Sequence, residues 1–178
     1  MSPVYPAFTM RMNVRYLLLI LSLLCLSVTA VRSADSRELR LPATGQPAVT
    51  FKVPDKWIVV PEGDGVLSVL NSVPATNVFT LTVAKDARDP DAYITQELNS
   101  SDGPAPKRIG DAEIDGCRGG HYTATGKANS GTTVTFDIHV LRIDEAHLLS
   151  VTRMASDKTS KADLALGDEL IKSIKVIR

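Results

Sequence analysis

The chain has 178 residues, with 20 basic and 20 acidic side chains, so its formal net charge is zero. This balance does not favour a polyanionic partner, and the basic residues are scattered rather than interleaved with aromatic ones, so nothing supports nucleic-acid binding. The length suits one ordinary domain with a real hydrophobic core, preceded by a leader.

Residues 1–30 form the most informative segment. Arg11 and Arg15 precede an apolar run over residues 16–26, and small residues follow up to Ala30. This order is typical of a secretory signal peptide, with cleavage after Ala30. The apolar run is about half as long as a membrane-spanning helix requires, so we expect cleavage rather than anchoring. The mature chain would be exported to a periplasm or the extracellular space, with no stable membrane span.

The first half of the mature chain is dominated by strand signals. Residues 31–47 are polar, contain Pro42, Gly45 and Pro47, and read as a flexible tether. Apolar residues then alternate with polar ones in short runs closed by proline or glycine turns, including the turn at Gly63 and Gly65. The predicted strands are 48–53, 57–60, 66–70 and 78–83. A short helix over 89–98 follows, with Asp89 as its N-cap.

The second half repeats this order. Strands are predicted over 108–114, 117–126, 132–143 and 147–154, and an amphipathic helix over 159–177. In the clearest strand, alternation places one apolar set of side chains on one face and a polar set on the other. The apolar set is Val134, Phe136, Ile138 and Val140, and the polar set is Thr133, Thr135, Asp137 and His139. The pattern predicts an α+β domain: an antiparallel sheet covered by helices on one or both faces.

A few residues also resemble a known family. Phe51, Pro54 and Trp57 stand in the F-x-x-P-x-x-W order that opens PsbP-like domains, and the turn at Gly116 and the segment ending at Ile174 are similar to that family's middle hairpin and closing helix. The resemblance spans residues 48–178 as a single domain. It implies the α/β/α sandwich of PsbP, the Ran-binding protein Mog and DcrB-like bacterial envelope proteins, whose members mostly dock on other proteins and share no catalytic residues.

Three histidines raise the question of a metal site. His121, His139 and His147 could act as ligands together with Asp137, because Asp137 and His139 share a strand face. His121 would approach them if the strand over 117–126 pairs with the strand over 132–143. No two of these residues have a tight spacing such as H-x-x-x-H, and the register is not fixed by the sequence. We therefore expect no metal ion and no cofactor.

Catalytic residues are not expected either. Cys117 is the one cysteine left after cleavage, and on a strand it would lie about 13 Å from His121, too far for a nucleophile–base pair. Asp86, Asp89 and Asp91 lack the spacing of a calcium loop. Trp57, the single tryptophan, is expected to pack under the C-terminal helix. The chain is thus expected not to be an enzyme.

Three functions remain open from the residues. The first is an exported, non-enzymatic binding module that docks on an envelope or secreted protein, with the turns at 63–65 and 127–131 as candidate contact loops. The alternative is a small-molecule or lipid binder, with a pocket between the sheet and the C-terminal helix lined by Val134, Phe136, Ile138 and Val140. The third is a hydrolase that uses Cys117 or the histidines.

Overall fold

The computed structural model describes residues 35–99, 104–127 and 131–178, so the predicted leader lies outside the described residues. Eight of the ten strands in this part were predicted from the alternation of apolar residues, and β1 and β10 were not. The elements are β1 (Ser36–Leu41), β2 (Ala48–Pro54), β3 (Ile58–Gly63), β4 (Val66–Leu70), β5 (Asn77–Lys85), α2 (Pro90–Asn99), β6 (Lys107–Ile114), β7 (Cys117–Lys127), β8 (Thr133–Arg142), β9 (His147–Ser156), α3 (Lys161–Lys172) and β10 (Lys175–Ile177).

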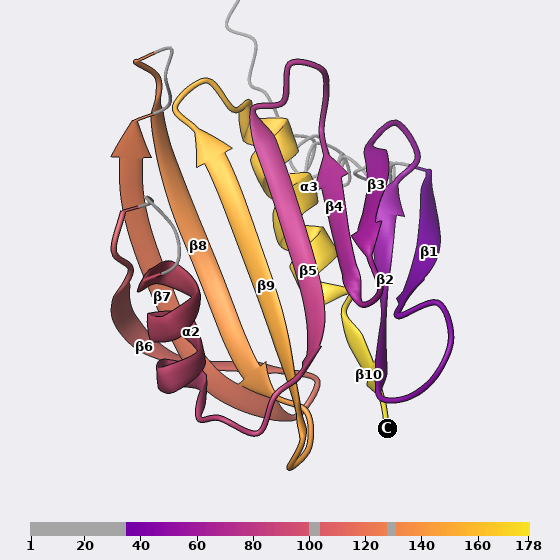
Figure 1. The fold of residues 1–178 in the computed structure, drawn as a ribbon. Coiled ribbons are helices and arrows are strands. Elements are labelled where there is room, and N and C mark those ends of the chain that lie inside the picture. Colours follow the sequence, from indigo (N-terminus) through magenta and orange to yellow (C-terminus); the bar gives the residue numbers. More distant parts are fainter. Residues whose placement is uncertain (1–34, 100–103, 128–130) are drawn as a thin grey trace, which may run out of the picture. The chain divides into compact units, whose positions relative to one another are not determined.

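The strands form two antiparallel sheets (Figure 1). The larger has seven strands in the order β3-β4-β5-β9-β8-β7-β6, and the smaller has the order β1-β2-β10. Short connections make hairpin neighbours, as predicted. The exceptions are the pair β5 and β9, which brings together segments that α2 and three strands separate in the sequence, and the pair β2 and β10, which lie near opposite ends of the domain sequence.

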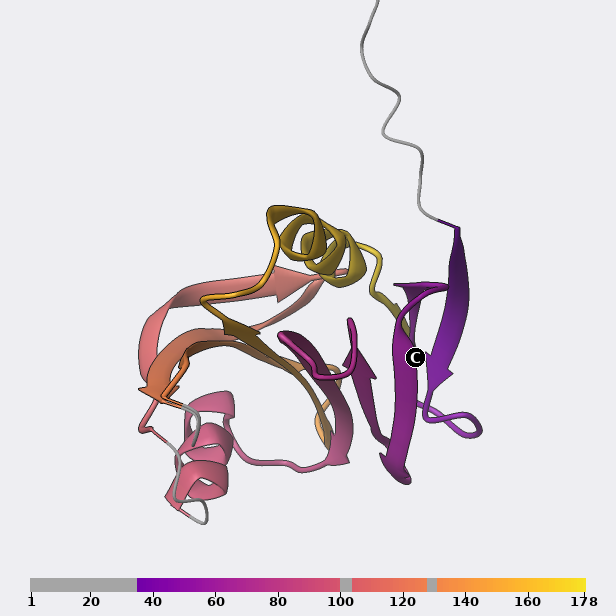
Figure 2. The same ribbon diagram turned by 90° about the horizontal axis from the view of Figure 1, so that it is seen from above.

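The two helices lie on opposite sides of the curved seven-stranded sheet (Figure 2). Helix α2 packs against β7 and β8, whereas α3 packs against β2 and β5. This arrangement confirms the predicted α+β architecture with helices on both faces.

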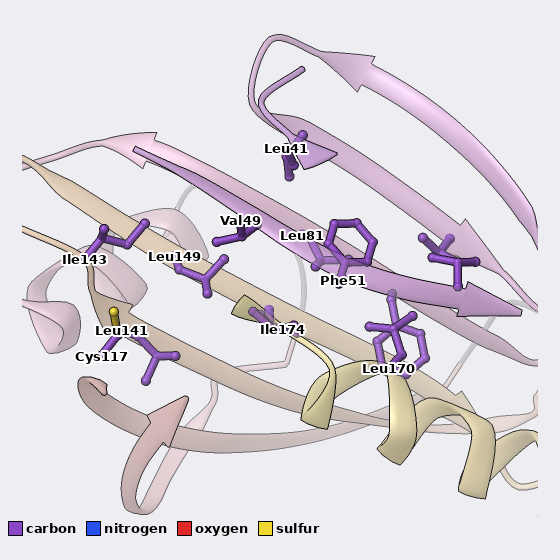
Figure 3. Close-up of a cluster of buried hydrophobic side chains, with 14 of the residues drawn as sticks. Leu41, Val49, Phe51, Leu81, Cys117, Leu141, Ile143, Leu149, Leu170 and Ile174 are labelled. Carbon is purple, nitrogen blue, oxygen red and sulfur yellow. The ribbon is translucent and has the colours of Figure 1, made fainter. Parts of the chain in front are cut away.

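The main hydrophobic core lies on the α3 side of the large sheet, where it is closed by strands of the small sheet (Figure 3). Trp57 is buried here as predicted, and its ring stacks on Phe79 with centroids 5.9 Å apart. The core also contains Phe51 of β2, Leu141 of β8 and Leu170 of α3. A second, smaller cluster joins α2 to the other face of the sheet.

The side chain of Arg153 on β9 links α3 to the large sheet through three polar contacts. Its Nε donates to Oδ1 of buried Asn77 at 3.1 Å, Nη2 donates to the Leu164 carbonyl at 3.0 Å, and Nη1 pairs with Asp168 at 2.7 Å. Gly167 of α3 comes so close that an added Cβ would meet Phe79 at 2.7 Å. The helix can therefore approach the sheet here only because position 167 has no side chain.

The expectation of a tether over residues 31–47 is wrong for Ser36–Leu41, which form strand β1. Leu39 and Leu41 alternate with charged residues and pack into the main core, while the backbone pairs with β2. The charged positions concealed this short period-two pattern. A strand whose outer positions carry arginine and glutamate has the composition of a polar linker.

The predicted C-terminal helix over 159–177 is too long. Helix α3 ends at Lys172, and Lys175–Ile177 form strand β10, paired with β2. The Ser173 hydroxyl donates to the Leu170 carbonyl at 2.7 Å and accepts the Lys52 backbone N–H at 2.8 Å. This serine closes the helix and joins it to the small sheet. The apolar stripe of the helix continues past its end to Ile174, which is buried just before β10, so hydrophobic periodicity alone does not mark the boundary.

Candidate functional site

The pairing of β7 with β8 brings together three of the residues considered for a metal site. His121 lies directly opposite His139 in the register, and Asp137 lies two residues before His139 on the same strand. Residues two apart on a strand share a face, so Asp137 and His139 continue the row that contains buried Leu141. The three side chains therefore lie on the α3 side of the sheet, next to the core but outside it.

The two imidazole rings stack, with centroids 4.3 Å apart and planes 13° from parallel. Nε2 of His121 forms a hydrogen bond with Oδ1 of Asp137, and Nε2 of His139 lies 3.6 Å from Oδ2 of the same carboxylate. One potential ligand atom from each residue lies within 4.8 Å of the others. The side chains of His139, His121 and Asp137 are 15%, 29% and 36% exposed, so solvent reaches this cluster.

The electrostatics of the cluster favour an anionic carboxylate. The adjacent imidazoles of His139 and His121 lower the pKa of Asp137 from its ordinary value of 3.8 to about 2. Asp137 is therefore ionised at neutral pH. Nδ1 of His139 is buried and has no hydrogen-bond partner among the described residues, so one nitrogen of the pair is left with unused bonding capacity.

An open groove of about 330 Å³ lies beside the cluster, bounded by β8, β9 and α3. Its lining residues are Thr133, Thr135, Asp137, Arg153, Ala155, Ser156, Asp157 and Leu164, and more of the exposed lining is apolar than polar. The groove lies between the sheet and the C-terminal helix, where a pocket was expected, but with a different lining. The apolar residues predicted to line it face the other side of the sheet, where Ile138 and Val140 pack in the smaller cluster with α2.

His147 and Cys117 do not join the cluster. His147 pairs through Nδ1 with Asp144 at 2.9 Å, and it lowers the pKa of that carboxyl. Cys117 is buried in the main core, where its one polar contact is Arg178 at 3.6 Å. Four residues along a strand separate Cys117 from His121, so the structure does not assemble a thiol nucleophile and base.

The three aspartates at the start of α2 also serve separate purposes. Asp86 pairs with Arg88, which lowers the pKa of Asp86 to about 2. Oδ1 of Asp89 accepts the backbone N–H of Asp91 at 2.8 Å, which supports the predicted capping role. Asp91 in turn accepts a hydrogen bond from the Tyr122 hydroxyl and fastens the helix to β7. All three carboxylates are thus occupied by hydrogen bonds or an ion pair within the protein.

The edge strand β3 is a second notable surface. Among the described strands, β3 pairs with β4 alone, so its other side is not hydrogen-bonded to a strand. Ile58 and Val60 share one face of this strand and are 40% and 41% exposed. The sequence predicted the strand, but the alternation of residues cannot tell which strand lies at an edge.

The opposite edge, β6, is built differently. It carries charged side chains at Lys107, Arg108, Asp111 and Glu113, and its pairing with β7 is interrupted by a bulge near Gly110. Charges and bulges are the usual devices that keep an edge strand from pairing with another protein. Between Ile58 and Pro61, β3 has no charged residue. Pro61 lacks a backbone N–H, and the pairing of β3 with β4 is irregular between Pro61 and Gly63, so these interruptions lie toward the end of the strand.

Neither a family model nor a curated protein sequence matches the chain. Solved structures do. LpqN from Mycobacterium tuberculosis, described as involved in cell envelope biogenesis, has 18% identity and a TM-score of 0.52, over 83% of this chain and 95% of that one. The Ran-binding protein Mog1p of Saccharomyces cerevisiae has 14% identity and a TM-score of 0.52, over 82% and 97%.

Two further structures are less similar. The cyanobacterial PsbP (CyanoP) of Synechocystis has 13% identity and a TM-score of 0.49, over 84% of this chain and 97% of that one. A protein of Bacteroides thetaiotaomicron matches with a TM-score of 0.48, and the chain spans 45% of its length.

The likeness to LpqN and Mog1p, together with the presence of one helix on each face of the seven-stranded sheet, defines a PsbP-like α+β fold. The resemblance first seen at Phe51, Pro54 and Trp57 is thereby confirmed for the fold. At such identities the fold alone is shared, and sites on it are specific to each protein. In the part of the chain that the structure describes, no helix is long and apolar enough to cross a membrane.

Proposed function

We propose that this protein is an exported, non-enzymatic module that docks on another envelope or secreted protein through edge strand β3. The observation that supports it most directly is the contrast between the two edges of the large sheet. Strand β6 carries four charged side chains along its length, whereas the Ile58–Pro61 part of β3 has none and exposes Ile58 and Val60 on an edge that pairs with no described strand. An extended segment of a partner can add to such an edge, gaining main-chain hydrogen bonds and apolar contacts.

The predicted contact turn at Gly63 and Gly65 lies at the end of this strand and joins β3 to β4. It carries Glu62 and Asp64, both exposed, so the partner segment would meet an acidic group at this end. We therefore expect a basic residue in the partner near the turn. In the second predicted contact loop, 127–131, residues 128–130 lie outside the described residues.

Export is supported by the basic, apolar and small-residue order of the leader, with the mature chain beginning after Ala30. The similarity to LpqN, a protein involved in cell envelope biogenesis, is compatible with this location, and Mog1p is a precedent for protein binding on the same fold. The domain organisation that we propose is a leader over 1–30 followed by one PsbP-like domain.

Site-specific photo-crosslinking in the native cell tests the docking proposal. A photoreactive residue at Val60 should capture one dominant partner, whereas the same residue at Ile109, exposed on the β6 edge, should not. Val60→Lys should abolish capture through a probe at Ile58 without unfolding the protein, because the side chain already reaches solvent. Equal capture from both edges, or unchanged capture in the Val60→Lys variant, would contradict the assignment of β3.

A second candidate function is the binding of a small molecule in the groove between β8, β9 and α3. The lining combines apolar surface with the hydroxyls of Thr133, Thr135 and Ser156, which suits a ligand that has both apolar and polar groups. Native mass spectrometry of protein purified from its own cells would reveal such a ligand as a discrete mass increase. Thr135→Leu should remove the increase, and a spectrum showing the bare chain alone would argue against this function.

A further inference from the structure

We propose that His121, His139 and Asp137 bind a divalent transition-metal ion, with Zn²⁺ as the best match to the three donors. This site is separate from the proposed docking edge, because β4, β5 and β9 lie between β3 and β8 in the sheet. It reverses the expectation of no metal site, which rested on an unknown strand register. The structure supplies that register.

The donor set is the first argument. Two imidazole nitrogens and one carboxylate oxygen match the composition of zinc sites that keep a fourth position open for water or another ligand. Ca²⁺ and Mg²⁺ prefer all-oxygen sites, so the two histidines select against them. With three ligands from the protein, the open position faces solvent at the rim of the groove to which Asp137 contributes.

The distances are the second argument. Ligands of a tetrahedral zinc ion, each about 2.0–2.2 Å from the metal, lie roughly 3.3–3.6 Å from one another. The donors of His139 and Asp137 are already 3.6 Å apart, and all three donors fall within 4.8 Å. The hydrogen bond between His121 and Asp137 would open to admit the ion. The backbone need not move, since all three residues sit on paired strands.

The rings must turn for their lone pairs to converge, because they now lie almost parallel. Rotation about the outer side-chain torsion of histidine is soft, so this adjustment is small in energy. His121 also has room to turn. Its register neighbour on β6 is Gly110, where even an added Cβ would find no atom within 4 Å.

The charges around the cluster are the third argument. The register partner of Asp137 on β9 is Arg153, but that guanidinium is occupied by Asn77, Asp168 and the Leu164 carbonyl. The Asp137 carboxylate is therefore left to the histidines, and its negative charge offsets part of the charge of an incoming cation.

Calorimetric titration with ZnCl₂ tests the proposal, using the purified protein without a histidine tag. We expect one ion per chain, no binding of MgCl₂, and a raised melting temperature in Zn²⁺. His121→Asn and Asp137→Asn should each weaken binding by more than about 100-fold, since even loss of a supporting outer-shell partner weakens metal sites by 10–100-fold. The matched control is His147→Asn, which removes a half-buried histidine paired with Asp144 and should bind Zn²⁺ like the unmodified protein.

Co²⁺ provides an independent readout of ligand geometry. A tetrahedral site with nitrogen and oxygen donors gives intense visible absorption, which should appear with one equivalent of Co²⁺ and vanish in His139→Asn. If His139→Asn does not fold, the same Co²⁺ measurement is made on His121→Asn and Asp137→Asn, whose side chains are more exposed to solvent. Absence of Zn²⁺ binding, an equal loss in His147→Asn, or unchanged binding in Asp137→Asn would overturn the proposal. None of these outcomes depends on the docking partner.

Discussion

Replacement of Arg153 by methionine is the sharpest test of how α3 is held to the sheet. The arginine makes three polar contacts, two with groups that have little access to water and one with a carboxylate that is 57% exposed. Methionine keeps most of the aliphatic volume against Phe79 but can donate no hydrogen bond. The variant should therefore lose the polar contacts without opening a large cavity.

The magnitude follows from which groups are left without a partner. Asn77 is fully buried, so its amide oxygen would lose its donor and have no water to replace it. An unsatisfied buried group of this kind costs about 1–3 kcal/mol, and the Leu164 carbonyl adds to this. Asp168 simply returns to solvent, which costs under about 1 kcal/mol for an exposed ion pair. We expect Arg153→Met to lower the free energy of unfolding by about 3 kcal/mol.

Urea unfolding followed by tryptophan fluorescence is the suitable assay, because Trp57 stacks on Phe79 beside the arginine. The matched control is Asp168→Asn, which breaks the ion pair and leaves both buried contacts in place. Its midpoint should move by much less than that of Arg153→Met. If the two variants lost equal stability, the ion pair would be the main contribution and the reasoning from Asn77 would be refuted.

Three further predictions concern other parts of the fold. Arg88 lowers the pKa of Asp86 to about 2, so the ionised carboxylate stabilises the fold fully above about pH 4 and this stabilisation is lost as the pH falls toward 2. In urea titrations over this range, the free energy of unfolding should fall less steeply with decreasing pH in Asp86→Asn than in the unmodified protein. Gly119→Ala would place a Cβ 1.9 Å from a backbone carbonyl of β8 and should destabilise by more than about 3 kcal/mol, whereas Gly110→Ala has open space and should leave the melting temperature unchanged. Cys117 is 1% exposed, so its thiol should react with a disulfide reagent only after unfolding; rapid labelling of the native protein would contradict its place in the core.

Much of the fold was accessible from the sequence because burial on one face leaves a period-two pattern. The strand 66–70 was predicted with the observed bounds, and the strand ending in Leu141 and Arg142 was found within one residue. The two elements that failed are those in which pairing, not periodicity, decides the structure. Strand β1 has charged residues next to Leu39 on both sides, and β10 is three residues long, so only their contact with β2 makes them strands.

The candidate site shows the same division. The sequence named His121, Asp137 and His139 and recognised that the last two share a face, because that follows from strand geometry. It could not place His121 opposite His139, since a one-residue slip in the register would put His121 on the other face of the sheet. It also grouped His147 with them, although that residue begins another strand and pairs with Asp144. Contacts between strands come from the register, which single-strand patterns do not encode.

The three-stranded sheet sets a constraint on the order in which the domain can form. Its middle strand, β2, is flanked by β1 and β10, and Thr50 pairs with Lys175, 125 residues later in the chain. A ribosome releases the first two strands long before the third. Pairings of such long sequence separation form slowly, because the loop must close before the contact is gained. Until Lys175–Ile177 emerge, β2 keeps one unpaired edge, and the small sheet remains incomplete during that interval.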